Sequence, residues 1–343
     1  MTFSVTWLKA GLAREPPLGY GAITCGSGLF TVRTNRPLLL LVAALALALA
    51  VSMRWGLPSG LPLSDDIFWH LRLPRVGLAA FAGASLALAG LLLQDLFRNP
   101  LVEPGLLGVS AGAGLATVTA MVLGFGGPLL LPLAAFGGAM AALVVVLAIA
   151  HRTGNGSAPL LLVGVAVNAL AGALVQLLLS VGNNELLRSA SFWLMGSFAQ
   201  ADSTLLLPAL LVLAAVTGWA VRRAGALDVW QLGDAEAGHL GLEVGRFRLA
   251  LLLLSSLLVA LAVCQSGGIG FIGLLAPHMV RRIGLSSHRE QLPATLIVGA
   301  LLAVLADLLA RGLIAPLELP VGVLTALLGA PSFLLLFLRE QRA

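Results

Sequence analysis

Charge is scarce in this chain. Its 343 residues include only 20 Lys or Arg and 15 Asp or Glu, and these fall between long apolar runs. Hydrophobic residues make up 59% of the sequence, and the mean hydropathy is +1.01. A soluble protein of this length needs more polar residues to cover its surface. Because a charge at the centre of a membrane helix costs about 2.5–3.5 kcal/mol, charge-free runs indicate a membrane protein.

Several kinds of site are also missing. The only lysine, Lys9, lacks the preceding glycine of a phosphate-binding loop, so any ATP that drives this protein is bound by another polypeptide. The five histidines show no metal-ligand spacing, and the two cysteines, Cys25 and Cys264, lie in different settings. The sequence therefore predicts no catalytic group, metal or cofactor in this chain.

Apolar runs of this length indicate membrane helices. In lipid, backbone groups must be paired within a helix or a closed barrel, and a barrel strand needs only about 9–11 residues. We therefore predict an all-α integral membrane protein with ten spans. They cover residues 37–53, 76–93, 105–123, 128–150, 159–181, 205–221, 247–264, 268–279, 292–309 and 319–338. The eighth is the shortest and is rich in glycine.

Basic residues favour one orientation for these ten spans. With the N-terminus inside, fifteen of the Lys and Arg residues lie on the cytoplasmic side. Five lie outside, namely Arg54, Arg72, Arg75, Arg188 and Arg311. Short cytoplasmic loops have such an excess of basic residues, so both termini are predicted to be cytoplasmic. Residues 1–34 are predicted to form a cytoplasmic N-terminal extension, and residues 35–343 the membrane domain.

Small residues indicate how the helices pack. The chain has 40 glycines, and helices in lipid associate through close backbone approach at small side chains. Gly108 and Gly112 form one GxxxG pair, and Gly83 and Ala87 belong to a similar stripe. These stripes predict a tightly packed bundle.

Few polar side chains fall inside the spans. Asp307 lies near the outer end of the ninth span, where Arg311 four positions later predicts an ion pair, with a proton relay as the alternative. Asn168 and Gln176 on the fifth span are interpreted as residues that form interhelical hydrogen bonds.

Two polar stretches flank the second span. Residues 72–75 (RLPR) place two arginines outside, where they either reach lipid headgroups or dock an acidic partner. Residues 94–108 (QDLFRNPLVEPGLLG) contain two prolines that forbid a continuous helix. This irregular backbone is either a tight turn or a gate at the inner mouth of a pathway.

A third polar stretch, residues 222–248, forms a long inner loop. It includes Asp234, Ala237 and Gly241 at helical spacing. This loop contains either a solvated surface helix or a short helix that sits in a groove of a cytoplasmic partner.

Three long segments resemble the FecCD-type permeases, the membrane subunits of type II ABC importers for ferric siderophores, haem and cobalamin. The first segment is RLPRVGLAAFAGASLALAGLLLQDLFRNPLVEPGLLGVSAGAG. The others are GGIGFIGLLAPHMVRRIGLSSHREQLP and ADLLARGLIAPLELPVGVLTALLGAPSFLLLFLR. Their order and spacing are those of the family, and the resemblance extends over about residues 38–339.

This resemblance implies ten helices per subunit and a homodimer with the translocation path at the subunit interface. It also implies two cytoplasmic ATP-binding subunits, which hold the ATP and Mg²⁺, and a periplasmic substrate-binding protein, in a bacterial inner membrane. Arg72, Arg75 and Arg311 match arginines that pair with glutamates of the binding protein. Our topology places all three outside, which agrees with that role.

The same resemblance assigns a coupling segment on the inner side. Residues from Gly233 to Gly241, in a coupling loop of about 222–246, match the helix that contacts the ATPase. Asp234, Ala237 and Gly241 match the acidic–Ala–Gly pattern of that helix, with aspartate in place of the commoner glutamate.

The resemblance also implies an inner gate. Asn99 and Leu101 match one side of the gate, and a second gate position maps to Ser157 and Ala158. Ala158 has no side-chain hydrogen-bonding group, which argues against a polar gate at that position.

The expected function is ATP-driven import of a metal chelate through a dimeric permease. Two other classes remain at this point. An ion-coupled secondary carrier would work without an ATPase, and a membrane enzyme would need converging catalytic side chains. The sequence does not distinguish haem, ferric siderophore and cobalamin as the substrate.

Overall fold

The computed structural model is helical throughout the part of the chain that it describes. The described residues are 36–54, 66–153, 157–199, 201, 203–314 and 317–340, so the expected extension 1–34 lies outside them. Within these ranges, the β-type pairing is a single bridge between Ile314 and Leu317. The expectation of an all-α protein is confirmed.

The helices follow one another in an order close to that expected. They are α1 (Arg36–Arg54), η1 (Ile67–Arg72), α2 (Leu73–Phe97), η2 (Pro104–Leu107), α3 (Val109–Val122), α4 (Leu130–Thr153), α5 (Ser157–Ser180), α6 (Asn184–Met195), α7 (Ser203–Arg222), α8 (Ala224–Trp230), α9 (Asp234–His239), α10 (Val244–Ser266), α11 (Ile272–Arg282), α12 (His288–Gly312) and α13 (Val321–Glu340). Each of the ten expected spans contains one of these helices, while α6, α8 and α9 are additional short helices.

Seven of the described helices are long and apolar enough to cross a membrane, namely α1, α2, α4, α5, α7, α10 and α12. The eighth expected span, by contrast, contains only the 11-residue helix α11. At 1.5 Å per residue this helix covers about 17 Å, roughly half of the hydrocarbon thickness. Since α11 begins at Ile272, the residues between Ser266 and Ile272 bring the chain into the bundle without a helix.

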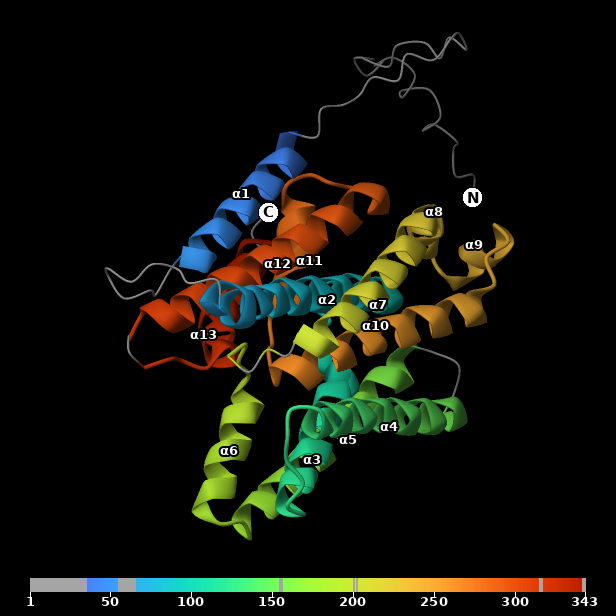
Figure 1. Ribbon diagram of the computed structural model, residues 1–343. Helices are drawn as coiled ribbons and strands as arrows, with labels where there is room; N and C mark the ends of the chain where they lie inside the picture. Colours follow the sequence, from blue (N-terminus) through green and yellow to red (C-terminus); the bar gives the residue numbers. More distant parts are fainter. Residues whose placement is uncertain are drawn as a thin grey trace, which may run out of the picture. The chain divides into compact units, whose positions relative to one another are not determined.

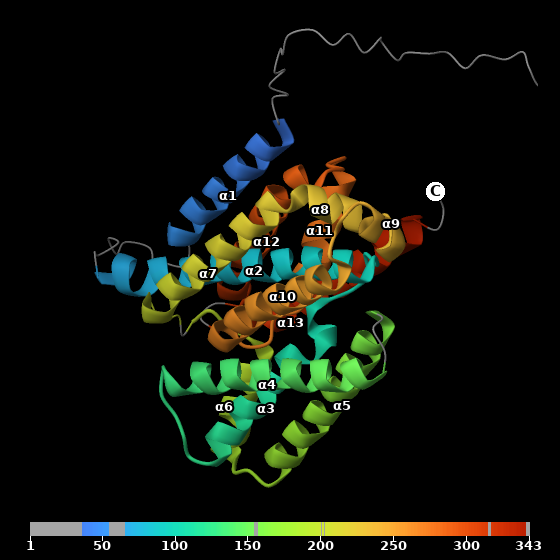
Figure 2. The same cartoon turned by 90° about the vertical axis from the view of Figure 1, so that its right-hand side faces the viewer.

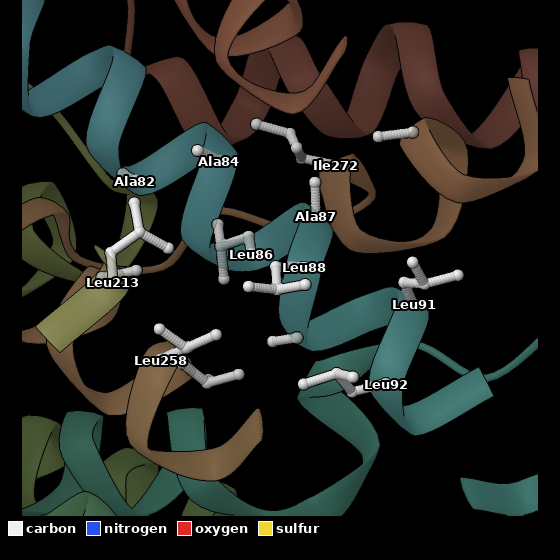
Figure 3. Close-up of a cluster of buried hydrophobic side chains, with 14 of the residues drawn as sticks. Ala82, Ala84, Leu86, Ala87, Leu88, Leu91, Leu92, Leu213, Leu258 and Ile272 are labelled. Atoms are coloured by element: carbon white, nitrogen blue, oxygen red, sulfur yellow. The ribbon is translucent and has the colours of Figure 1, made fainter. Parts of the chain in front are cut away.

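Helix α2 lies in the middle of the bundle. In both views α1 and α12 lie on one side of it, and α3, α4 and α5 on the other (Figures 1 and 2). Its side chains are apolar around the whole circumference, and nearly all are buried. Figure 3 shows Leu86 and Leu88 of this helix in one cluster with Leu213, Leu258 and Ile272. A helix that is hydrophobic all round is expected to be surrounded by protein, and α2 is.

Glycines allow the backbones of two helix pairs to meet. Gly83 on α2 lies against Gly299 on α12, and a Cβ added at either position would overlap the carbonyl oxygen of the other. Gly112 on α3 and Gly138 on α4 face each other in the same way. These contacts confirm the expected tight packing, since helices in lipid gain most from close van der Waals contact. Gly108 instead precedes α3 with a φ of 79°, in the left-handed region that favours glycine.

We expect Gly299→Ala to lower the free energy of unfolding by about 1–3 kcal/mol, because the added methyl group must force α2 and α12 apart. The measurement is thermal or denaturant unfolding of the purified permease in detergent. Gly137→Ala on α4 is the matched control, because a Cβ there meets no heavy atom within 4 Å. An equal loss of unfolding free energy in the two variants would show that α2 and α12 can accommodate an extra methyl group without being forced apart.

Candidate functional site

Two clusters of charged side chains lie at opposite ends of α2. The arginine cluster consists of Arg72, Arg75, Asp307, Arg311 and Glu318, around the start of α2 and the end of α12. The Asp234 cluster consists of Asp234, Arg98, Arg248 and Trp230, and it joins the end of α2 to α8, α9 and α10. With 25 residues at 1.5 Å each, α2 separates the clusters by about 37 Å.

Asp307 is the centre of the arginine cluster. Its side chain is fully buried, with Oδ1 3.0 Å from Nη2 of Arg75 and Oδ2 3.0 Å from Nε of Arg311. Arg75 also donates a 2.9 Å hydrogen bond to Glu318, and Arg311 donates a 2.5 Å hydrogen bond to Oγ of Ser52 on α1. The predicted Asp307–Arg311 ion pair is confirmed, and it belongs to a network that joins α1, α2, α12 and the segment before α13.

The three arginines assigned to docking differ in how far they reach the surface. The side chains of Arg75 and Arg311 are 13% and 4% exposed, because both are paired within the chain. Arg72 is half-buried and lies one helical turn before Arg75. Neither lipid contact nor a docking partner is therefore needed to balance Arg75, whose charge is offset by Asp307 and Glu318.

Asp234 begins α9 and is bound by arginines from two other helices. Nη2 of Arg98, just after α2, lies 2.6 Å from its Oδ1, and Arg248 on α10 binds its Oδ2. Trp230 lies beneath both arginines, with the Arg98 and Arg248 guanidinium carbons 4.8 Å and 5.8 Å from its ring centroid. Such cation–π contacts strengthen the ion pairs by orienting the guanidinium groups.

The ion pairs also keep Asp234 charged. Partial burial raises its pKa, but the hydrogen bond from Arg98 and the charge of Arg248 outweigh this effect, so the pKa lies below its ordinary value of 3.8. Because the pKa is lowered by folding, the pairing stabilises the fold above that value and is lost only as the pH falls through the lowered pKa. Asp234 is therefore ionised throughout the physiological range.

Trp230 and His288 fix α8 to the core. The indole Nε1 of Trp230 donates a 2.9 Å hydrogen bond to the backbone oxygen of Asp95 on α2. The imidazole of His288, the first residue of α12, lies between Asp228 on α8, at 2.5 Å, and Asp95, at 3.0 Å. Through these contacts α8 is attached to the ends of both α2 and α12, so the segment between α7 and α10 is not a free loop.

The coupling segment is only partly the helix expected from its spacing. Gly233 precedes α9 with a φ of 118°, and Ala237 is fully buried on the helix. Gly241 lies beyond the end of α9 with a φ of 86°, so it does not share a helical face with Asp234 and Ala237 as the spacing suggested. A left-handed residue ends the helix, and this turn leads directly to Glu243 and α10.

The residues assigned to the gate lie in two separate segments. Asn99 and Leu101 form a turn after α2, in which Oδ1 of Asn99 accepts a 2.9 Å hydrogen bond from the Leu101 amide. The Leu101 side chain is exposed. Ser157 and Ala158 are the first residues of α5, and their side chains lie outside the part that the structure describes. The gate assignment stays a prediction.

Residues 99–108 do not stay at the end of the bundle, where the sequence placed them. Oε1 of Glu103 accepts a 2.7 Å hydrogen bond from the amide of Phe271, just before α11. The side-chain amide of Asn168 on α5 donates a 3.1 Å hydrogen bond to the Gly105 oxygen, which confirms its interpretation as an interhelical residue. Gln176, by contrast, is exposed and forms no hydrogen bond with a described residue.

Two cavities lie beside these segments. One, of about 510 Å³, lies between α4, α9 and α10 and is lined by Asp234, Arg248 and apolar side chains. The other, of about 170 Å³, is lined by Glu103, Ser110, Phe271 and several glycines. In the described ranges, no three His, Cys, Asp or Glu side chains converge as a metal site requires. The charged groups form mechanical links between helices, and no nucleophile–base pair is among them.

The sequence identified the arginines, Asp234 and the Asp307–Arg311 pair, but not the partners of Arg75 and Asp234. Asp95, Trp230 and His288 gave no signal of their own, because Trp230 contacts a residue 135 positions away and His288 one 193 positions away. The one usable signal was a surplus of arginine at the ends of apolar runs, which requires carboxylates nearby.

We expect Asp307→Asn to cost about 3–5 kcal/mol of unfolding free energy, because it leaves two largely buried arginines without their shared carboxylate. Glu318→Gln is the matched control. Its side chain is 48% exposed, so its loss costs about 0–1 kcal/mol. Thermal unfolding in detergent measures both, and a mild effect of Asp307→Asn would mean that Arg75 and Arg311 do not depend on the central carboxylate.

Comparison with known proteins places this architecture among transporters. The sequence model of the FecCD transport family matches residues 38–339. The hemin transport system permease protein HmuU of Yersinia pestis is 45% identical over 325 residues, which cover 89% of this chain and 95% of HmuU. The vitamin B12 import system permease protein BtuC of Salmonella arizonae is 38% identical over 317 residues, covering 89% and 93%.

Solved structures agree with the sequence comparison. An inward-facing transporter of the metal-chelate ABC type matches with a TM-score of 0.80 and 34% identity, covering 88% of this chain and 98% of that chain. PsaBC from Streptococcus pneumoniae, at 17% identity and a TM-score of 0.55, shares the fold alone. The helices, their order and the extent of the match lead to one assignment: this chain belongs to the FecCD transport family and is a membrane permease of an ABC transporter.

Proposed function

We propose that this permease imports a metal chelate from the periplasm into the cytoplasm, driven by ATP that separate subunits hydrolyse. The observation that carries the proposal is the 45% identity, over 89% of the chain, to a hemin transport permease. The two charge clusters support it, since they provide one attachment point at each end of the bundle. The arginine cluster faces the periplasm, and the Asp234 cluster faces the cytoplasm.

Haem is the first substrate to test. The hemin permease is 45% identical to this chain, whereas the vitamin B12 permease is 38% identical. Cobalamin and ferric siderophores remain the alternatives. All three are bulky chelates, and a periplasmic binding protein that delivers them can supply most of the selectivity.

The Asp234 cluster suggests how ATP hydrolysis moves the permease. The short helix α9 exposes Leu232 and Leu240 at its two ends, which suits a contact with a cytoplasmic ATPase subunit. Its first residue is tied to Arg98 at the end of α2 and to Arg248 on α10. A displacement of α9 is therefore transmitted to both helices at once, because ion pairs with fixed geometry resist separation.

A second copy of the chain completes the path. Helix α5 exposes a row of large apolar side chains, among them Leu162, Leu170 and Leu177 at 60–73% exposure. Its first residues include Ser157 and Ala158, and η2, which follows Asn99 and Leu101, packs against it. The path lies between the two α5 faces, and these residues open and close its inner end.

The orientation follows from the basic residues. Both termini lie in the cytoplasm of a bacterial inner membrane, since fifteen of the Lys and Arg residues then lie inside. The ends of α2 alone run the other way, with Arg72 and Arg75 outside and Arg98 inside, so the orientation rests on the count over the whole chain.

Reconstituted uptake tests the function. The permease is placed in liposomes with its ATPase and binding protein, and uptake of haem, a ferric siderophore and cobalamin is measured with and without ATP. Uptake that requires ATP, the ATPase and the binding protein supports the proposal. Flux that an ion gradient drives through the permease alone would establish a secondary carrier instead.

For the coupling role, we expect Asp234→Asn to lower the amount of substrate transported per ATP at least about threefold, because it weakens the links to Arg98 and Arg248. Glu236→Gln on the same helix is the control, since its charge forms no ion pair with a described residue. In the wild type the ion pairs of Asp234 stay formed from about pH 7.5 to 5, because the pKa of Asp234 lies below 3.8. A ratio that Asp234→Asn leaves unchanged would contradict the coupling role.

For docking, Arg72→Glu is the probe, because a change at Arg75 or Arg311 would break an ion pair with the buried Asp307. We expect the variant to bind the binding protein more weakly. Its remaining affinity should also depend less on salt, because charges near the surface are screened over about 8 Å at physiological salt. The measurement is a titration of the binding protein at low and at physiological salt. Arg188→Glu is the control outside the cluster, and equal effects of both variants would remove Arg72 from the docking site.

A further inference from the structure

Two interruptions of the helices meet deep inside the bundle. The first follows α2, where the chain turns at Asn99 and leads through Glu103 to η2. The second lies between α10 and α11 and includes Gly267, with a φ of 70°, and Phe271. Backbone without helical pairing is tolerated at membrane depth only where protein or a water-filled cavity satisfies it. Each of the two segments supplies some of the contacts that the backbone of the other requires.

Their meeting point lies beside the second half of α2, where Gly273 packs against Gly90, the eighteenth residue of that helix. A Cβ added at Gly273 would approach both the ring of Pro104 and the backbone oxygen of Leu86. Leu86 is the fourteenth of the 25 residues of α2. Ile272 joins the cluster of buried side chains around the middle of this helix (Figure 3). Glu103 and Phe271 thus lie inside the bundle, nearer to the end of α2 than to its start.

Glu103 accepts a hydrogen bond from the amide of the residue that caps the start of α11. The first amides of a helix lack partners in the preceding turn, and leaving them unpaired in an apolar interior is unfavourable. The Phe271 amide donates to Oε1 of Glu103 over 2.7 Å. The positive end of the helix dipole also favours a carboxylate at this position. A charge that the chain excludes from its continuous spans is therefore accommodated here.

Phe271 itself has an unusual backbone conformation. Its φ of 68° is one of two positive values among the described residues that are not glycine, the other being that of Arg98. A bulky residue adopts the left-handed region only when its surroundings enforce it. The hydrogen bond from its amide to Glu103 is one such restraint, so loss of this bond allows the segment to relax.

A cavity beside the bond leaves room for movement. It measures about 170 Å³ and is lined by Glu103, Ser110, Gly270 and Phe271, among others. The inner side of the same junction is held separately, because Gln94 on α2 donates to the oxygens of Val102 and Gly273 over 3.4 Å and 3.3 Å. The junction thus has a fixed side at Gln94 and a side at Glu103 that faces open space.

We propose that the hydrogen bond between Glu103 and the Phe271 amide is a latch that closes and opens during the transport cycle. Glu103 is then a positioning residue, which holds the start of α11 against the segment after α2 in one state of the permease and releases it in the other. The inference rests on the proposed function, since it gives the ATP-driven cycle a moving part. The latch requires a hydrogen-bond acceptor at position 103, but not a negative charge.

Amide hydrogen exchange of the assembled transporter tests the latch directly. Exchange at the Phe271 amide, resolved with overlapping peptides, is compared between the nucleotide-free complex and a complex trapped with ATP. We expect the rate to differ by at least about fivefold between the two states, because opening the bond exposes the amide to the cavity. Equal rates in both states would overturn the proposal, and this measurement needs no variant.

Three variants separate the bond from the charge and from the cavity wall. Glu103→Ala removes the acceptor and should accelerate exchange at Phe271 at least about tenfold, and reduce substrate transported per ATP. Glu103→Gln keeps an acceptor oxygen and should stay within about threefold of the wild type in both measurements. Ser110→Ala changes the same cavity without touching the bond and should have no effect.

The outcomes distinguish this proposal from the proposed function. Equal loss in Glu103→Gln and Glu103→Ala would show that the charge matters and overturn the latch, as would a wild-type phenotype of Glu103→Ala. If Glu103→Ala does not assemble with its ATPase, Glu103→Gln and the nucleotide comparison decide. A wild-type complex without ATP-driven uptake contradicts the proposed function, whereas exchange at Phe271 in the permease still shows whether Glu103 holds that amide.

Discussion

Backbone amides inside a membrane must find their partners within the protein, and the rest of this structure depends on how that requirement is met. Helix α2 meets it by itself over 25 residues, and it can therefore occupy the middle of the bundle with apolar side chains on every face. Where the helices stop, side chains replace the missing backbone partners. Glu103, Gln94 and Asn168 each bond the backbone of an interrupted segment.

The two clusters of paired charges link helices. Asp307 joins α12 to α2, and Asp234 joins α9 to α2 and α10. In both clusters two arginines share one carboxylate, which offsets the cost of burying the charges. The shared carboxylate joins two helices at Asp307 and three segments at Asp234. A permease that transmits movement between its two faces needs rigid links of this kind at its ends and mobile ones between them.

The apolar runs predicted the helices well, because a run of membrane-spanning length has little freedom in lipid, although the eighth contains only the 11-residue helix α11. They did not predict α6 and α8, whereas the spacing of Asp234 and Ala237 did indicate the short helix α9. The two prolines near Asn99 correctly indicated that α2 ends there, yet nothing local showed that the chain then returns to mid-depth. Residues that meet across 168 positions, as Glu103 and Phe271 do, share no local pattern.

The burial of α2 also bears on how the protein is made. Its hydropathy of 2.1 is close to the 2.2 of α1, so the translocon recognises both as ordinary spans, although α1 remains largely exposed and α2 does not. Gly299 of α12, the partner of Gly83, is synthesised about 200 residues after it. During that interval the nascent chain presents the glycine face of α2 to lipid or to a chaperone. The pairing of α2 and α12 forms only after α12 has been made.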